Sequence, residues 1–184
     1  IIDGRDIGTI IIPNAEVKIY VDADACPVKK EIERKFIATH IPDKGSGFLI
    51  EQGYLQMDNA RSVRVRTINN ANKKEGWLTV KGSSDKSGVS RYEFETKISY
   101  SDATNLLKLC DLPLINKTRY NYDYNGFLWE IDEFHKENRG LLIAEIELKH
   151  ADETFPLPHF VDIEVTGQKK YYNSMLTKNP FKSW

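Results

Sequence analysis

Apolar and polar residues alternate in short stretches over most of this chain. The stretches VRVRT at 63–67, WEID at 129–132 and AEIEL at 144–148 place an apolar side chain at every second position. A period of two predicts β-strands. Polar, glycine-containing segments such as 43–47 and 82–88 separate these stretches. Short strands at fairly regular spacing are typical of an all-β barrel or sandwich.

Two helices interrupt this pattern. Ser101 is a suitable N-cap, and the leucine-rich stretch that comes after it ends before Pro113. A second, short helix is expected near Lys170–Leu176, before Pro180. The alternation and the two helices together predict a mainly β (α+β) fold.

Like charges recur two residues apart in six of the strand-like stretches. In a strand, residues i and i+2 point to the same face, about 7 Å apart, so each pair repels itself. Four pairs are acidic and two are basic, which indicates a partner that combines an anion with a metal cation. The pairs are Glu31/Glu33, Arg64/Arg66, Glu93/Glu95, Lys117/Arg119, Glu130/Asp132 and Glu145/Glu147.

Alternation alone leaves two arrangements open for these charges. They could form the solvated outer face of an antiparallel sheet, or the polar interior of a closed barrel. The recurrence in six strands favours the barrel interior. Trp77 and Trp129 are then expected to pack on the outer wall.

Length and composition narrow the class of protein. The 184 residues (21.2 kDa), with 40% hydrophobic and 29% charged residues, suit one globular domain. The net charge of −1 argues against a nucleic-acid binder that works through bulk charge. We find no run of 18 apolar residues and expect no membrane partner. Cys26 and Cys110 form no metal-binding spacing, which favours a reduced, cytoplasmic protein.

From Glu31 to Trp184 the chain resembles the CYTH family of triphosphate tunnel metalloenzymes. Its first stretch, EIERKF, carries that family's Glu-x-Glu-x-Lys signature. The later motifs resemble those of the small bacterial members and stand in the same order. They are QGYL, VRVR, LTVKG, RYEFE, KTRY, WEIDEF, AEIEL, and EVTG with YYN after it.

This resemblance implies a fold and a set of site residues. The fold is an eight-stranded antiparallel closed β-barrel that forms a tunnel with a few flanking helices. The residues implied for divalent metal are Glu31, Glu33, Asp132, Glu145 and Glu147. The residues implied for triphosphate are Lys35, Arg64, Arg66, Lys81, Lys117 and Arg119. The candidates for proton transfer are Glu145, Lys35 and Tyr54, and further inward-facing acids are expected at Glu93, Glu95, Glu130 and Glu164.

The function implied is metal-dependent hydrolysis of a linear triphosphate, with Mg²⁺ or Mn²⁺ as cofactor. Inorganic tripolyphosphate is the favoured substrate, and the terminal phosphate is released. A class IV adenylate cyclase and a non-catalytic polyphosphate- or nucleotide-binding module are the alternatives. Partners are then limited to a small phosphorylated substrate, with a homodimer left open.

The first 29 residues do not follow the pattern of the rest of the chain. The segment DGRDIGTIIIPNAEVKIYVDADA at 3–25 resembles an internal stretch of bacterial cytidylate kinase. The chain has no GxxxxGK[ST] phosphate loop, so the kinase's triphosphate site is absent. We expect residues 1–29 to be an appended partial segment without catalytic function, and residues 30–184 to be the tunnel domain.

Overall fold

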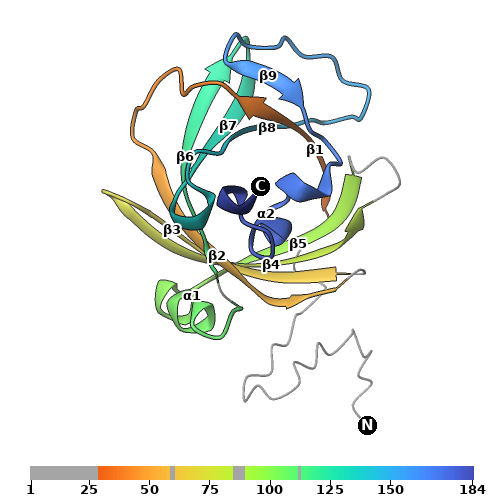
Figure 1. Ribbon diagram of the computed structural model, residues 1–184. Helices are drawn as coiled ribbons and strands as arrows, with labels where there is room; N and C mark the ends of the chain where they lie inside the picture. Colours follow the sequence, from red (N-terminus) through yellow and green to blue (C-terminus); the bar gives the residue numbers. More distant parts are fainter. Residues whose placement is uncertain (1–28, 59–60, 85–89, 112) are drawn as a thin grey trace.

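A computed structural model describes residues 29–58, 61–84, 90–111 and 113–184 (Figure 1). The expected appended segment lies outside the described residues, except for Lys29, which begins the first strand.

An antiparallel sheet of nine strands makes up most of the described chain. The strand order is β5-β4-β3-β2-β6-β7-β8-β1-β9. The strands are β1 (Lys29–Ala38), β2 (Phe48–Met57), β3 (Arg61–Asn70), β4 (Lys73–Ser84), β5 (Ser90–Ile98), β6 (Ile115–Tyr124), β7 (Phe127–Phe134), β8 (Leu142–Glu147) and β9 (Val161–Glu164). The predicted mainly β, antiparallel fold is therefore confirmed. The described sheet has one strand beyond the expected eight, because the short β9 adds to the edge of β1.

The sheet curls round, so that strands far apart in the order meet. One edge of β1 pairs with β8. Its other edge pairs first with β5, from Lys29 opposite Glu93 to Ile32 opposite Ser90, and then with β9. In Figure 1 the strands run round the C-terminal residues.

One α-helix of eight residues, α1 (Tyr100–Leu107), packs on the outside of β2, β3 and β4. Its N-cap is Ser99 rather than the expected Ser101, since the Ser99 hydroxyl accepts a hydrogen bond from the Asp102 amide at 3.0 Å. Gly76 permits this packing, because a Cβ there would lie 2.6 Å from the Ala103 Cβ.

The other helical elements are short. They are η2 (Lys136–Asn138), η3 (Lys169–Tyr171), α2 (Asn173–Leu176) and η4 (Phe181–Ser183). The helix expected near Lys170–Leu176 thus corresponds to η3 and then α2. Among the described residues, no helix has the length and apolar character that a bilayer crossing requires.

Two apolar clusters cover the outside of the sheet. Beneath α1, the buried side chains of Val63, Val65 and Leu78 pack against Leu107 and its neighbours. On the far side, Phe36, Trp129 and Ile131 pack with Ile146 and with Phe160, which lies in the connection before β9. Trp129 is fully buried there, as expected for the outer wall.

A third apolar cluster fixes the C-terminal residues at one end of the ring of strands. Leu176 of α2 is fully buried against a group that we call the end cluster: Ile115, Phe134, Leu141 and Ile143. Asn138 of η2 holds this segment through its side chain, which accepts from the Phe181 amide at 2.8 Å and donates to the Leu176 carbonyl at 3.4 Å.

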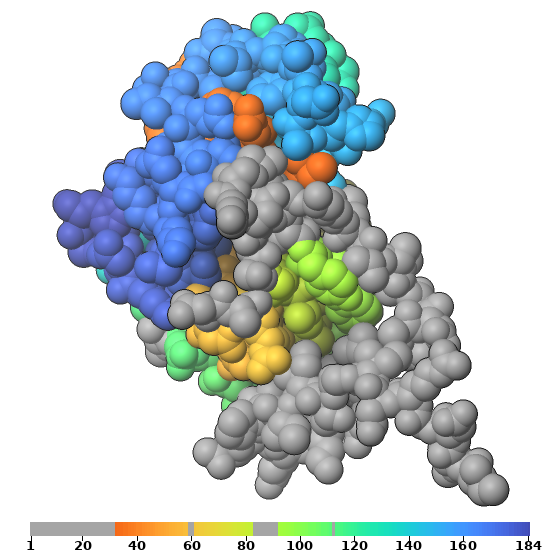
Figure 2. Space-filling model, turned by 90° about the vertical axis from the view of Figure 1, so that its right-hand side faces the viewer, coloured from red at the N-terminus to blue at the C-terminus, as the bar shows by residue number. Residues whose placement is uncertain are grey.

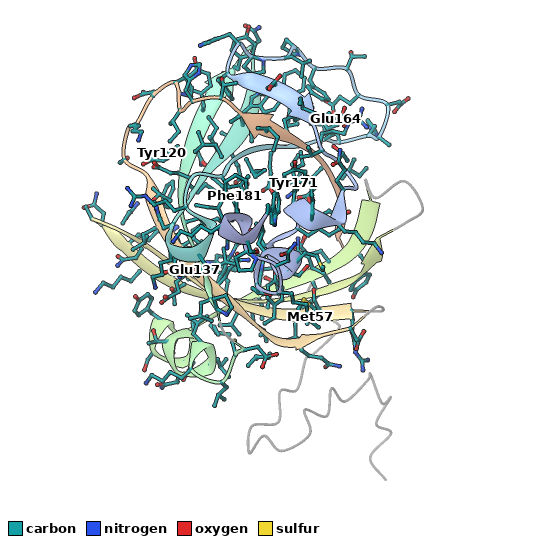
Figure 3. The ribbon with its side chains drawn as sticks, in the orientation of Figure 1. Met57, Tyr120, Glu137, Glu164, Tyr171 and Phe181 are labelled. Carbon is teal, nitrogen blue, oxygen red and sulfur yellow. The ribbon has the colours of Figure 1, made fainter. Side chains whose placement is uncertain are left out.

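The figures agree on the position of this segment. Figure 2 is turned by 90°, so that the front of Figure 1 lies at its left, and the C-terminal residues are on that side. Tyr171 and Phe181, which pack against the end cluster, lie near the centre of the ring in Figure 3. The C-terminal segment therefore covers one end of the ring.

Candidate active site

The charged side chains singled out from the sequence lie on one face of the curled sheet, which we call the inner face. Directly paired residues of neighbouring strands share a face: Arg64 is opposite Thr79, and Arg119 is opposite Asp132. The alternate residues of the same strands form the outer apolar clusters. The described inner-face residues with polar side chains include Glu33, Lys35, Gln52, Tyr54, Arg64, Arg66, Trp77, Thr79, Lys81, Glu93, Glu95, Lys117, Arg119, Glu130, Asp132, Glu145 and Glu147.

Burial excludes the solvated-face alternative. Lys35, Lys117 and Asp132 are 5%, 2% and 0% exposed, and Lys81 and Glu145 are 8% exposed. Charged side chains are almost never buried to this extent unless they are paired. The inner face carries such pairs on two groups of strands.

Strands β1, β6, β7 and β8 form the acidic wall, in which Arg119 is the centre. Its guanidinium donates to both carboxylate oxygens of Asp132 at 2.7 Å, to Glu145 Oε2 at 2.8 Å, and to Glu130. Glu130 and Glu145 are directly opposite each other on β7 and β8, so Arg119 bridges two facing like charges. These carboxylates raise the pKa of Arg119 further, against the effect of burial.

Two buried lysines complete the acidic wall. Lys35 donates to Glu145, and its Nζ lies 3.9 Å from Glu33. Burial alone would lower the pKa of Lys35, but Glu145 and Glu33 outweigh it and raise the pKa above its usual value. Lys117 donates to Asp132 at 2.5 Å. Burial and the neighbouring Arg119 cation nevertheless lower the pKa of Lys117 to about 8.

Strands β3, β4 and β5 form the basic wall, in which a single carboxylate is the centre. Glu95 accepts from Arg64 at 3.2 Å, from Arg66 at 3.1 Å and from the Thr79 hydroxyl at 2.6 Å. Burial would raise the pKa of Glu95, but Arg66 and the other donors lower it. Lys81 pairs with Glu93 at 3.0 Å. These contacts join three cations to two carboxylates, and the pair of Lys97 with Glu75 on β5 and β4 adds one more of each.

The candidate metal ligands fall into two groups. Glu33 and Glu147 are directly opposite each other on β1 and β8, while Asp132 and Glu145 are held together by Arg119. Only the backbone of Glu31 is described, one inner position before Glu33. Carboxylate oxygens are the donors that Mg²⁺ and Mn²⁺ prefer, so the chemistry of this set fits such an ion. Among the described residues, no group of three or more His, Cys, Asp or Glu side chains is already arranged to hold a metal ion.

The structure brings two of the three proton-transfer candidates into contact. Lys35 and Glu145 form an ion pair across β1 and β8. Tyr54 lies on β2, opposite Arg64, and its hydroxyl accepts from Gln52 Nε2 at 3.4 Å.

Two expectations about orientation were wrong. Glu164 does not join the inner acids: it is opposite the outward-facing Phe36, and its carboxylate pairs with Arg34 at 3.2 Å. Trp77 does not lie on the outer wall, because it is opposite Arg66 on the inner face. Its position two residues before Thr79 and four before Lys81 was a usable signal in the sequence.

Sequence reasoning also missed two uncharged inner-face residues. Thr79 shares Glu95 with the two arginines. Gln52 is fully buried between Arg66 and Ile115, its partners on β3 and β6. Each lies two residues before a predicted site residue on the same strand: Thr79 before Lys81, and Gln52 before Tyr54. This spacing was a signal for the inner face.

The N-terminal residues show a separate similarity. The cytidylate kinase family model matches residues 1–36. A cytidylate kinase from Nitrobacter winogradskyi is 71% identical over 24 residues, which are 13% of this chain and 11% of that kinase. The predicted resemblance of this segment is confirmed, as a match to a small part of the kinase.

The rest of the chain is similar to triphosphatases. An inorganic triphosphatase from Acetivibrio thermocellus is 46% identical over 158 residues, which cover 84% of this chain and 97% of that protein. The crystal structure of the inorganic triphosphatase NE1496 has a TM-score of 0.57 at 29% identity, covering 80% of this chain and 93% of the other. The CYTH domain model matches residues 29–175, so the chain belongs to the CYTH family.

Proposed function

We propose that this protein hydrolyses a linear triphosphate, inorganic tripolyphosphate in the first place, and releases its terminal phosphate. The observation that carries the proposal is the pairing of a carboxylate-rich and an arginine-rich wall on one buried face. The 46% identity to a protein named inorganic triphosphatase, over nearly its whole length, supports it. The chain is thus a hydrolase that acts on phosphoanhydride bonds.

The eight strands β1 to β8 act as a closed tunnel around the substrate. The pairing of β1 with β5 over four residue pairs supports this closure. A closed ring excludes bulk water from the charges, which strengthens their interaction with a polyanion.

The triphosphate lies between the walls and replaces the internal ion pairs. Arg64 and Arg66 exchange the Glu95 carboxylate for phosphate oxygens, which arginine forks bind in the same way. Lys81, Lys35, Lys117 and Arg119 contact the remaining phosphates. The cations neutralise charge that develops as the phosphoanhydride bond breaks.

Membership of the CYTH family carries a divalent-metal requirement, and we assign Mg²⁺ or Mn²⁺ to the carboxylates of the acidic wall. Glu33 and Glu147, with Glu31 on the same strand, are the first ligands, and Asp132 and Glu145 lie beside them. Because Asp132 and Glu145 are ion-paired, they become available only when Lys35, Lys117 and Arg119 turn to phosphate. When bound, the ion offsets phosphate charge.

Glu145, Lys35 and Tyr54 are the groups that handle the proton. Within the acidic wall, Lys35 donates a hydrogen bond to the Glu145 carboxylate. Tyr54 lies beside the basic wall and donates to a phosphate oxygen from there.

A phosphate-release assay over tripolyphosphate, ATP, GTP and thiamine triphosphate tests the proposal, with Mg²⁺ or Mn²⁺ and an EDTA control. We expect phosphate release from tripolyphosphate that stops in EDTA. Formation of cyclic AMP and diphosphate from ATP would identify a cyclase. Tight binding of tripolyphosphate without turnover under either metal would identify a binding module.

The remaining assignments stay predictions. The tunnel domain begins at residue 30, and the preceding segment takes no part in catalysis. We place the enzyme in the cytoplasm, with a small phosphorylated molecule as its partner and a homodimer as the form to test.

A further inference from the structure

Four buried polar side-chain atoms on the inner faces of β2, β3 and β4 have no hydrogen-bond partner within the described part of the chain. They are Gln52 Oε1, Arg64 Nε, Arg66 Nε and Trp77 Nε1. Their residues are neighbours, since Gln52 is opposite Arg66 and Arg66 is opposite Trp77. Buried polar atoms are rarely left unpaired, so such a row indicates atoms that a ligand or water completes.

The chemistry of the four atoms divides them. The two arginine nitrogens and the indole nitrogen are donors, and phosphate oxygens are acceptors that suit them. Gln52 Oε1 is an acceptor. A fully ionised triphosphate has no donor to offer it, whereas the attacking water has O–H groups that donate.

The position of Gln52 fits this role. Its side chain is 0% exposed, and its amide nitrogen donates to the Tyr54 hydroxyl at 3.4 Å, which leaves the amide oxygen as the unsatisfied end. No titratable neighbour is needed to keep an amide oxygen an acceptor, so it works at every pH.

We propose that Gln52 is a positioning residue that holds the attacking water through its amide oxygen, beside the phosphate bound by Arg66; this rests on the proposed function. The water oxygen bonds to the terminal phosphorus, and the bridging P–O bond breaks with its electron pair on the departing diphosphate. The water's proton passes to the Glu145 carboxylate, one of the proton-handling groups of the proposed function. Gln52 gains and loses no proton.

Steady-state kinetics of Gln52→Met and Gln52→Glu with tripolyphosphate test the proposal. Methionine keeps the length of the side chain but removes the acceptor, so we expect kcat to fall on the order of a hundredfold, the scale for loss of one aligned polar group. KM, and the affinity for tripolyphosphate measured by calorimetry in EDTA, should change less than about threefold. Gln56→Met is the matched control on the same strand, where the amide donates to Asp58 at 3.1 Å, and should keep the parent kcat.

Gln52→Glu keeps an acceptor oxygen and adds a charge that titrates. We expect kcat within about tenfold of the parent enzyme and a new acidic limb in its pH profile, which a purely structural residue would not produce. If thermal melting shows that Gln52→Met does not fold, Gln52→Glu alone tests whether Gln52 positions the attacking water. Absence of the new limb there would count against the proposal.

Three results would overturn it. An unchanged kcat in folded Gln52→Met would show that the water is held elsewhere. A raised KM with unchanged kcat would show that Gln52 binds phosphate through its amide nitrogen. Equal losses in Gln52→Met and Tyr54→Phe, with no further loss in the double variant, would show that Gln52 acts only through Tyr54. A parent enzyme that releases no phosphate would instead refute the proposed function itself.

Discussion

The acidic and basic walls neutralise their charges in opposite ways. In the acidic wall a cation is the centre, since Arg119 holds Asp132, Glu130 and Glu145. In the basic wall an anion is the centre, since Glu95 holds Arg64 and Arg66. A metal cation can take the place of Arg119 among the carboxylates, and a phosphate can take the place of Glu95 between the arginines. The two walls are therefore suited to the metal and the triphosphate of one complex.

Loss of the cationic centre should have the largest effect. Arg119→Ala leaves three carboxylates close together without their shared partner. Breaking a buried pair by removing one partner costs about 3–5 kcal/mol in the free energy of unfolding. Urea denaturation in EDTA measures this. Arg119→Lys, which keeps a charge but not the fork, should lose less, and equal stability of Arg119→Ala and the parent would refute the account of this wall.

Removal of one proposed metal ligand comes next. Glu147→Gln hardly changes the volume but removes a charge opposite Glu33, so turnover should fall on the order of a hundredfold. Added Mg²⁺ or Mn²⁺ should restore part of it, since weakened metal affinity obeys mass action. The matched control is Glu164→Gln, an acid on the outer side paired with Arg34, which should keep full activity.

The basic wall should respond differently to the same assay. Arg66→Ala removes a phosphate-binding fork, and we expect KM for tripolyphosphate to rise about tenfold or more. Added metal should not lower it. If metal rescued Arg66→Ala as well as Glu147→Gln, the division of labour between the walls would be wrong.

The lowered pKa of Lys117 gives a smaller, pH-dependent effect in the metal-free protein. The pKa of Lys117 is about 8 in the folded protein, against 10.5 for an ordinary lysine. Between pH 8 and pH 10.5, Lys117 is therefore neutral in the folded protein but still protonated in the unfolded chain. Its contribution to stability therefore rises with pH from about 8 to 10.5, by up to about 1.4 kcal/mol per pH unit. The parent protein in EDTA should show this rise relative to Lys117→Met, and parallel pH profiles would refute it.

The smallest effect is expected outside both walls. A chain that begins at Lys30 keeps every described inner-face side chain, so its kcat and KM should equal those of the full chain. A folded truncation that has lost activity would assign a role to the appended segment.

The sequence carried most of this site because alternation and family motifs both report on which face a side chain occupies. Arg64 and Arg66 could be assigned in this way without coordinates. Their shared partner could not, because the contact with Glu95 depends on the register of three strands. Trp77 was misassigned by its apolar character although its spacing from Lys81 was correct for the inner face. Glu164 was misassigned because only the pairing of β9 with β1 sets its direction.

The C-terminal residues that cover one end of the ring have a consequence for chain length. Leu176 is seated on the end cluster, so we expect that a long polyphosphate does not pass between the two walls and leave at this end. We therefore expect a polyphosphate chain that enters between the walls to stop at these apolar residues. On this account we expect cleavage near the inserted end of a polyphosphate, and little activity on bonds in the middle of a long chain.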